Sequence, residues 1–187
     1  MSDFWNNLVK RFGPREDIVN IPGAPIIINT YIDSLQKRTL MPQLSSFKGE
    51  IALDVGSGIG RWTLVLIGKA RLVIGIDISR EMIRIAKGKI RKNKVDFILS
   101  TATALPLRSN SVDLSLSCTC LQHITEEEEL KQSLREITRV TRNRILILEL
   151  MSKTKRQKLT YYPTLIIPKS SYTSTLTKFG AKSVSDH

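Results

Sequence analysis

Short apolar runs alternate along the chain with longer segments in which apolar residues recur every three or four positions. The short runs predict strands at 50–55, 72–77, 95–100, 112–118 and 144–150. The longer segments predict helices at 3–12, 27–44, 59–68, 79–92, 125–141 and 170–179. Strands that alternate with helices in this way predict an α/β fold, with a mostly parallel sheet and helices on both faces.

Two of the predicted helices, at 3–12 and 125–141, carry recognisable end signals. The helix at 3–12 gathers its apolar residues on one side and closes at Gly13 and Pro14. Core packing is the favoured interpretation of that side, and a membrane-surface or partner-binding helix is the alternative. The helix at 125–141 opens on Thr125, a predicted N-cap, and continues with glutamates that suit the positive end of the helix dipole.

The length of 187 residues, with 41% hydrophobic residues, suits one domain better than two. The chain has no apolar run of the ~20 residues that a membrane span needs, and its N-terminus lacks the apolar stretch of a secretion signal. Cys118 and Cys120, the only cysteines, have neither metal-site nor disulfide spacing and suit reduced thiols on one side of a strand. We therefore expect a cytoplasmic protein without a membrane span.

Three glycines follow the first predicted strand in "LDVGSGIGRW" at 53–62. Gly56, Gly58 and Gly60 clear side chains from a turn that leads into a helix, so we expect a ligand there, outside the carboxyl ends of the strands. The fingerprint for a dinucleotide needs a further glycine where this chain has Arg61, and Asp54 would repel a pyrophosphate. An NAD-dependent dehydrogenase is accordingly the weakest of the interpretations.

A ligand with an adenosine, no phosphate and a cationic amino group would suit Asp54 instead. S-adenosylmethionine (SAM) is such a ligand, and its ribose hydroxyls call for an acid at the end of the next strand. Asp77 in "VIGIDIS" is that acid.

These residues resemble the class I SAM-dependent methyltransferases, and most closely the branch with the ubiquinone and menaquinone biosynthesis enzymes. The resemblance covers about residues 50–150, through "LDVGSGIGRW", "GIDISREMIRIAK", "ATALPLRSNSVDLSLSCTCLQHI" and "LREITRVTRNRILILE" in that order. It implies a Rossmann-like fold and transfer of a methyl group from SAM.

The resemblance also assigns the cofactor site. It implies the methionine part of SAM beside Asp54, Gly56, Ser57, Gly58 and Gly60, and beside the backbone around Ser117 and Cys118. It implies the ribose on Asp77 and the adenine against Ile78, Thr101 and Ala102. Thr101 stands where the family often has an aspartate, and its uncharged hydroxyl predicts a weaker hydrogen bond to the adenine.

The resemblance divides the single domain at 1–187 into three parts. It implies N-terminal cap helices at 1–46, a cofactor-binding core at 47–150 and an acceptor-side segment at 151–187. The family usually closes its sheet with two more strands, but only "AKSVSDH" follows the last predicted helix. We therefore expect a shortened C-terminus with six strands, or a partner chain on an exposed sheet edge that would make an oligomer.

Methyl transfer from a sulfonium needs no metal, and the sequence offers no metal-ligand cluster. His123 is the candidate general base, and a role in fixing a loop or capping a helix is the alternative. Glu149 could reach the site, although an ion pair with a nearby Lys or Arg is the favoured interpretation. Packing is favoured over a thiolate nucleophile for Cys118 and Cys120, because no neighbouring base is evident.

The chain carries a formal net charge of +12, with basic residues concentrated at 86–94 and after Met151. A solvated, ion-pairing surface is the favoured explanation. The methyl acceptor is expected to be a small molecule, with RNA or protein as the alternative that the charge suggests. The rival class is a non-catalytic basic module that binds nucleic acid or a protein partner on the same fold. Aromatic residues expected to shape the acceptor pocket are Trp5, Phe12, Tyr31, Tyr161 and Tyr162.

Overall fold

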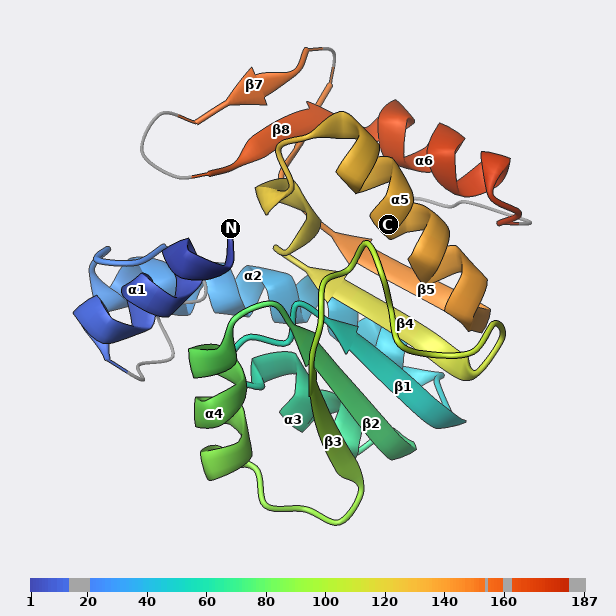
Figure 1. Ribbon diagram of the computed structural model, residues 1–187, viewed down its shortest axis with the longest axis horizontal. Coiled ribbons are helices and arrows are strands. Elements are labelled where there is room, and N and C mark those ends of the chain that lie inside the picture. The colour runs from blue at the N-terminus through green and yellow to red at the C-terminus, as the bar shows by residue number, and fades with distance from the viewer. Residues whose placement is uncertain (14–20, 154, 160–162, 182–187) are drawn as a thin grey trace.

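The computed structural model describes residues 1–13, 21–153, 155–159 and 163–181. Its centre is a five-stranded sheet with the strand order β3-β2-β1-β4-β5, and every neighbouring pair is parallel (Figure 1). The strands are β1 Gly49–Val55, β2 Ala70–Asp77, β3 Val95–Leu99, β4 Val112–Cys118 and β5 Thr141–Leu148. The carboxyl ends of these strands therefore meet at one edge of the sheet.

Helices cover both faces of this sheet. They are α2 Ile26–Ser45, α3 Arg61–Ile67, α4 Arg80–Lys89 and α5 Glu127–Val140. Side chains of a strand alternate between the two faces, so Leu53 and Val55 join the core under α5, while Ala52 joins the core under α2 and α3. This confirms the predicted α/β architecture.

The N-terminal helix α1 Ser2–Phe12 packs on α4 and not on the sheet (Figure 1). Leu8 and Val9 of α1 lie in one apolar cluster with Met82 and Ile85 of α4. The apolar side of α1 is thus packed against the protein, as the favoured interpretation predicted.

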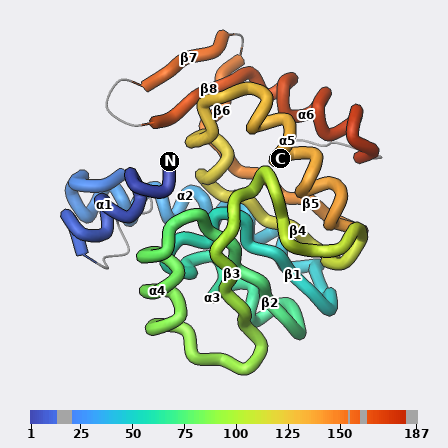
Figure 2. The backbone as a smooth tube through the Cα atoms, viewed as in Figure 1, coloured from blue at the N-terminus to red at the C-terminus, as the bar shows by residue number. Residues whose placement is uncertain are grey.

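The chain after β5 forms a second, smaller sheet from β6 Met151–Ser152, β7 Gln157–Lys158 and β8 Leu165–Pro168, in the order β6-β8-β7. Helix α6 Lys169–Lys178 follows and packs on α5. Figure 2 shows this orange and red part of the backbone beside α5. Within the described residues the main sheet has five strands, and the sixth strand expected from "AKSVSDH" falls on 182–187, outside them.

Two local predictions are wrong. The N-cap of α5 is Glu126 and not Thr125, and the Glu126 side chain makes no capping hydrogen bond. The glutamates of the first turn lie at the positive end of the helix dipole, which their charge stabilises. Strand β5 begins three residues early, at Thr141, because it follows α5 without a loop. The Thr141 hydroxyl holds this junction by donating to the Ile137 carbonyl (2.6 Å).

Candidate functional site

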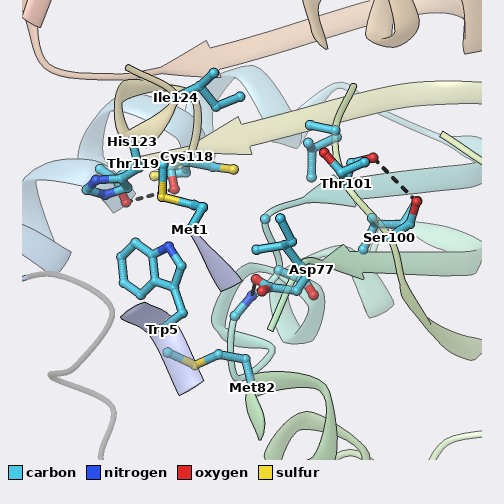
Figure 3. Close-up of a pocket in the computed structure, with 18 of the residues that line it drawn as sticks. Met1, Trp5, Asp77, Met82, Ser100, Thr101, Cys118, Thr119, His123 and Ile124 are labelled. Atoms are coloured by element: carbon cyan, nitrogen blue, oxygen red, sulfur yellow. Dashed lines mark hydrogen bonds between the residues drawn. The ribbon is translucent and has the colours of Figure 1, made fainter. Parts of the chain in front are cut away.

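A cavity opens at the edge of the sheet where β1, β2 and β4 end, and loops after four strands line it (Figure 3). Nine of the twelve residues expected at the site line this cavity: Gly56, Ser57, Gly58, Asp77, Ile78, Thr101, Ala102, Cys118 and His123. The other three, Asp54, Gly60 and Ser117, lie outside the lining. The parallel topology thus gathers residues that are up to 67 positions apart, from 56 to 123.

The glycine loop after β1 turns through left-handed backbone conformations. Gly56, Gly58 and Gly60 have φ of 70°, 53° and 89°. A Cβ on Gly56 would collide with the Cys120 side chain, and one on Gly60 with Ile90. Backbone conformation therefore requires both glycines, and packing against Cys120 adds to this requirement at Gly56. Gly56 also lines the cavity, so its expected place beside a ligand stays a prediction.

Asp77 ends β2 with its carboxylate fixed beside the glycine loop. One oxygen accepts from the Gly58 N–H and the other from the Ser79 N–H, both at 2.8 Å. Burial raises the pKa of Asp77 above its ordinary value, against the effect of these N–H groups. Each carboxylate oxygen can accept a further hydrogen bond, so Asp77 offers acceptors to hydroxyl groups of a ligand.

Asp54 does not reach the cavity, in contrast to its expected contact with a ligand. It points toward α3 and accepts from the Thr63 hydroxyl (2.6 Å). Burial is the main cause that raises its pKa to about 6, and the charges of Arg61 and Asp77 also act on it. Its influence on a ligand would therefore be electrostatic and indirect.

Arg61 lines the cavity and belongs to the same charge network as Asp54. Its guanidinium forms an ion pair with Asp33 of α2 at 2.7 Å and lies over the Trp62 ring, 5.2 Å from the centroid. This arginine takes the position at which a dinucleotide fingerprint has glycine.

Glu149, just after β5, neither lines the cavity nor forms an ion pair in the described part of the chain. One of its oxygens accepts from the Ser117 hydroxyl (2.9 Å) and from the N–H groups of Cys120 (3.1 Å) and Leu121 (3.0 Å). The other accepts from the Gln122 N–H (3.2 Å). Burial raises its pKa to about 7. The predicted ion pair is wrong, because the buried carboxylate instead holds the loop that carries His123.

His123 lies in η2 Leu121–His123, a short 3-10 helix, and is buried. Its Nδ1 donates to the Pro163 carbonyl (2.9 Å) and lies 3.1 Å from the Thr164 hydroxyl. Burial lowers the pKa of His123 to about 4, although the carbonyls of Pro163 and Thr119 favour the protonated form. The ring also meets Trp5 edge-on, with centroids 4.9 Å apart. His123 is thus a neutral wall of the cavity near pH 7.

The two cysteines are free and occupy different elements. Cys118 is the last residue of β4, and Thr119, with a φ of 54°, turns the chain away from the strand. The expectation that Cys120 also lies on the strand is therefore wrong. Burial raises the pKa of Cys118 to about 12 and that of Cys120 well above its ordinary value. Both thiols are therefore protonated at neutral pH, in accord with a packing role.

One buried polar group of the lining, the Ser57 hydroxyl, has no hydrogen-bond partner among the described residues, and Ser57 is 5% exposed. The Trp62 indole N–H, by contrast, faces the Cys118 sulfur. A buried polar group without a partner costs about 1–3 kcal/mol. Unpaired groups in the wall of a cavity are what a site for a polar ligand requires.

Several lining residues were not singled out from the sequence. Arg61 and Trp62 follow the glycine loop directly, so their positions were a sufficient signal. Trp5 was expected at the acceptor pocket and does line the cavity, together with Met1. Tyr31 does not line it and is 63% exposed. Phe12 packs with the α1–α4 cluster, and Tyr161 and Tyr162 lie outside the described residues.

Comparison with known proteins agrees with this geometry. The model of a family described as "Methyltransferase domain" matches residues 53–147, which is about half of the chain. The demethylmenaquinone methyltransferase of Oceanobacillus iheyensis is 35% identical over 83 residues, which cover 41% of this chain and 35% of that protein. The chain therefore corresponds to about a third of that relative's length.

Two solved structures share the fold at low sequence identity. A SAM-dependent methyltransferase from Leishmania major superposes with a TM-score of 0.79 at 16% identity, over 98% of this chain and 74% of that one. Phosphoethanolamine N-methyltransferase 1 of Haemonchus contortus, solved with phosphoethanolamine and S-adenosylhomocysteine, has a TM-score of 0.74 at 21% identity, over 92% of this chain and 38% of that one. The family model matches residues 53–147, and the parallel sheet with its loop after β1 agrees with that match. The chain therefore belongs to the methyltransferase domain family.

Proposed function

We propose that this chain binds SAM in the cavity and transfers its methyl group to a small, apolar acceptor. The observation that carries the proposal is the Asp77 carboxylate, held by two backbone N–H groups beside the glycine loop. Its remaining acceptor capacity suits a pair of ribose hydroxyls. SAM would supply an activated methyl group, and methyl transfer is the reaction expected from the match to the methyltransferase domain family.

The other lining residues fit the remaining parts of SAM. Ile78, Thr101 and Ala102 provide a mostly apolar wall for the adenine. The unpartnered Ser57 hydroxyl lies on the loop expected to face the methionine part. The buried carboxylates Asp54 and Asp77 act on each other electrostatically, and this negative charge favours a cationic ligand over a diphosphate.

The acceptor side of the cavity favours an apolar molecule. Met1, Trp5 and Ile124 contribute apolar surface there, beside the neutral His123 (Figure 3). With a pKa of about 4, His123 is a weak general base at neutral pH. We therefore favour an acceptor atom that already carries a free lone pair at neutral pH, and positioning as the main contribution of the protein.

The name of the relative from Oceanobacillus iheyensis, demethylmenaquinone methyltransferase, also states a small-molecule acceptor. The rival interpretation, a non-catalytic basic module, is less favoured because the Asp77 carboxylate and the glycine loop both line the cavity. The division into cap helices at 1–46, a core at 47–150 and an acceptor-side segment at 151–187 remains part of this proposal.

Calorimetric titration with SAM, S-adenosylhomocysteine and NAD tests the binding. We expect binding of the first two, and a loss of about tenfold or more for Asp77→Asn, because a charge-assisted hydrogen bond is lost. Asp96→Asn is the matched control, since Asp96 is exposed on the neighbouring strand β3. Binding of NAD alone, or equal effects of the two substitutions, would refute the site.

Methyl transfer is measured separately, with methyl-labelled SAM and a cell extract fractionated into metabolites, protein and RNA. Label in the metabolite fraction supports the proposed acceptor class. Label in RNA or protein would overturn the acceptor class, and SAM binding without any transfer would overturn the catalytic role.

A further inference from the structure

The first half of α2 exposes apolar side chains. Ile26, Ile27 and Tyr31 are 69%, 71% and 63% exposed, and Ile28 and Leu35 are each 42% exposed. Ile27, Tyr31 and Leu35 are spaced four residues apart, so they lie along one side of the helix. We call these five residues the α2 apolar face.

The opposite side of the same helix buries polar groups. Asn29 and Gln36 are 3% and 6% exposed, and the Asn29 side chain bonds to the backbone of Ile21. The Gln36 Oε1 is buried without a hydrogen-bond partner in the described part of the chain. Packing within the chain would favour the reverse orientation, with the isoleucines inside. Packing among the residues that the structure describes therefore does not explain the exposure of the α2 apolar face.

The charges around this face are positive. Asp33 is the only acidic residue of α2, and both Lys37 and Arg61 pair with it at 2.7 Å. Arg38 follows Leu35 by about one turn and is exposed. Before the start of α2, Gly23 lies near the Phe12 ring at the end of α1, and the Arg11 guanidinium lies over that ring, 5.3 Å from its centroid. Exposed Lys37 and Arg38 thus follow the α2 apolar face directly, and a further arginine lies at the end of α1.

We propose that the α2 apolar face docks on the surface of an anionic lipid bilayer. A helix that lies in the interface of a bilayer needs an apolar side that enters the acyl boundary and basic residues that meet anionic headgroups. The α2 apolar face and its flanking basic residues supply both. No helix among the described residues is long and apolar enough to cross a membrane.

A second copy of the chain is the less favoured occupant. A stable interface between proteins typically involves about 20–30 residues on each side, and the α2 apolar face has five. Two copies that each carry a net charge of +12 would also repel each other. The same charge attracts the chain to an anionic bilayer.

The docking surface is linked to the cavity through one ion pair. Asp33 of α2 binds Arg61, which lines the cavity. Bilayer contact through α2 would thus bring the cavity near the membrane, where apolar acceptors concentrate. The docking proposal itself does not depend on methyl transfer.

Vesicle flotation of the full chain tests the proposal. The probes are vesicles of phosphatidylcholine alone and of phosphatidylcholine mixed with phosphatidylglycerol. We expect binding to the mixed vesicles only, and about tenfold or more weaker binding for the double variant Ile27→Glu/Tyr31→Glu, because it puts charge where apolar surface enters the bilayer. Leu64→Glu on α3 is the matched control, since Leu64 is also apolar and 52% exposed.

The outcomes separate the occupants. Mixed-vesicle binding that the double variant loses and Leu64→Glu keeps supports the proposal. No vesicle binding overturns it, as does binding that the double variant retains. A concentration-dependent dimer in analytical ultracentrifugation that only the double variant loses would assign the face to a second copy. Circular dichroism melts of the three proteins verify that each variant is folded.

Discussion

Glu149→Gln is the substitution that best tests the electrostatics of the site. The wild-type carboxylate accepts hydrogen bonds from the Ser117 hydroxyl and from three N–H groups of the loop after β4. Glutamine keeps one acceptor oxygen and cannot ionise. Its amide nitrogen would face one of the donors, which costs about 1–3 kcal/mol at any pH.

The pH dependence follows from the raised pKa of Glu149. Burial brings that pKa from its ordinary value of 4.5 to about 7 in the folded protein. Below pH 4.5 the side chain is neutral in both states. As the pH rises toward 7, the unfolded chain releases a proton that the folded protein retains, so the stability contributed by the neutral form is lost. The difference in pKa corresponds to about 3 kcal/mol of unfolding free energy.

Urea denaturation from about pH 4.5 to about pH 8 measures this effect as the difference in unfolding free energy between wild type and variant. We expect Glu149→Gln to be less stable than wild type by about 1–3 kcal/mol at the acidic end. This gap should close or reverse its sign toward the alkaline end, because wild type loses about 3 kcal/mol there. Asp54, whose pKa is also raised, is present in both proteins and cancels in the difference.

Glu136→Gln is the matched control with the opposite sign. Glu136 accepts from the Leu105 N–H and pairs with Arg139, which holds its pKa below the ordinary value. Its stabilisation is present at neutral pH and is lost as the pH falls through the folded-state pKa. The Glu136 gap should therefore be largest at neutral pH. A Glu149 gap that is constant, or that widens with pH as the Glu136 gap does, would refute the reasoning.

Two further predictions concern the loops. Gly56→Ala should lower the unfolding free energy by about 2–4 kcal/mol in urea denaturation, because of the left-handed φ and the collision with Cys120. The double variant Gly56→Ala/Cys120→Gly should recover part of this loss, because the collision is removed. Strictly additive losses of the two single variants would contradict this reasoning. If His123 stays neutral with its pKa near 4, single-turnover methyl transfer should be flat from about pH 6 to 8. An inflection near the ordinary histidine pKa that His123→Asn removes would instead show a general base.

The core was predictable because its rules are local. Apolar runs marked all five strands of the main sheet, and parallel strands bring their carboxyl ends together, so the loops with Ser57, Asp77 and Thr101 had to meet. The orientation of Asp54 follows from the same alternation. Ala52 faces α2 and α3, so the residue two positions later points to the same face, toward Thr63.

The role of Glu149 could not be read in this way. An isolated acidic residue after a strand suggests an ion pair, and nothing nearby in the sequence names its partners. The donors are 27–32 residues earlier. They meet Glu149 because β4 and β5 pair with Cys118 opposite Leu148, which brings the turn at Thr119 beside the end of β5. The contact depends on where β4 and β5 end relative to each other, and a sequence pattern places the ends of strands only to within about 2–4 residues.

The position of the N-terminal helix α1 could not be predicted from the sequence either, and this position affects which acceptor the proposed site would favour. Asn6 of α1 accepts hydrogen bonds from the Ser79 hydroxyl (2.8 Å) and the Glu81 N–H (3.2 Å), next to Asp77 at the start of α4. This contact fixes Trp5 over the cavity, although the two segments are more than 70 residues apart and no periodicity links them. Residues at the carboxyl ends of the strands, where we propose that SAM binds, are thus positioned by the sheet, while Trp5 on the proposed acceptor side is positioned by a long-range contact of α1. We therefore expect substitutions in α1 to change acceptor preference while the glycine loop and Asp77 stay intact.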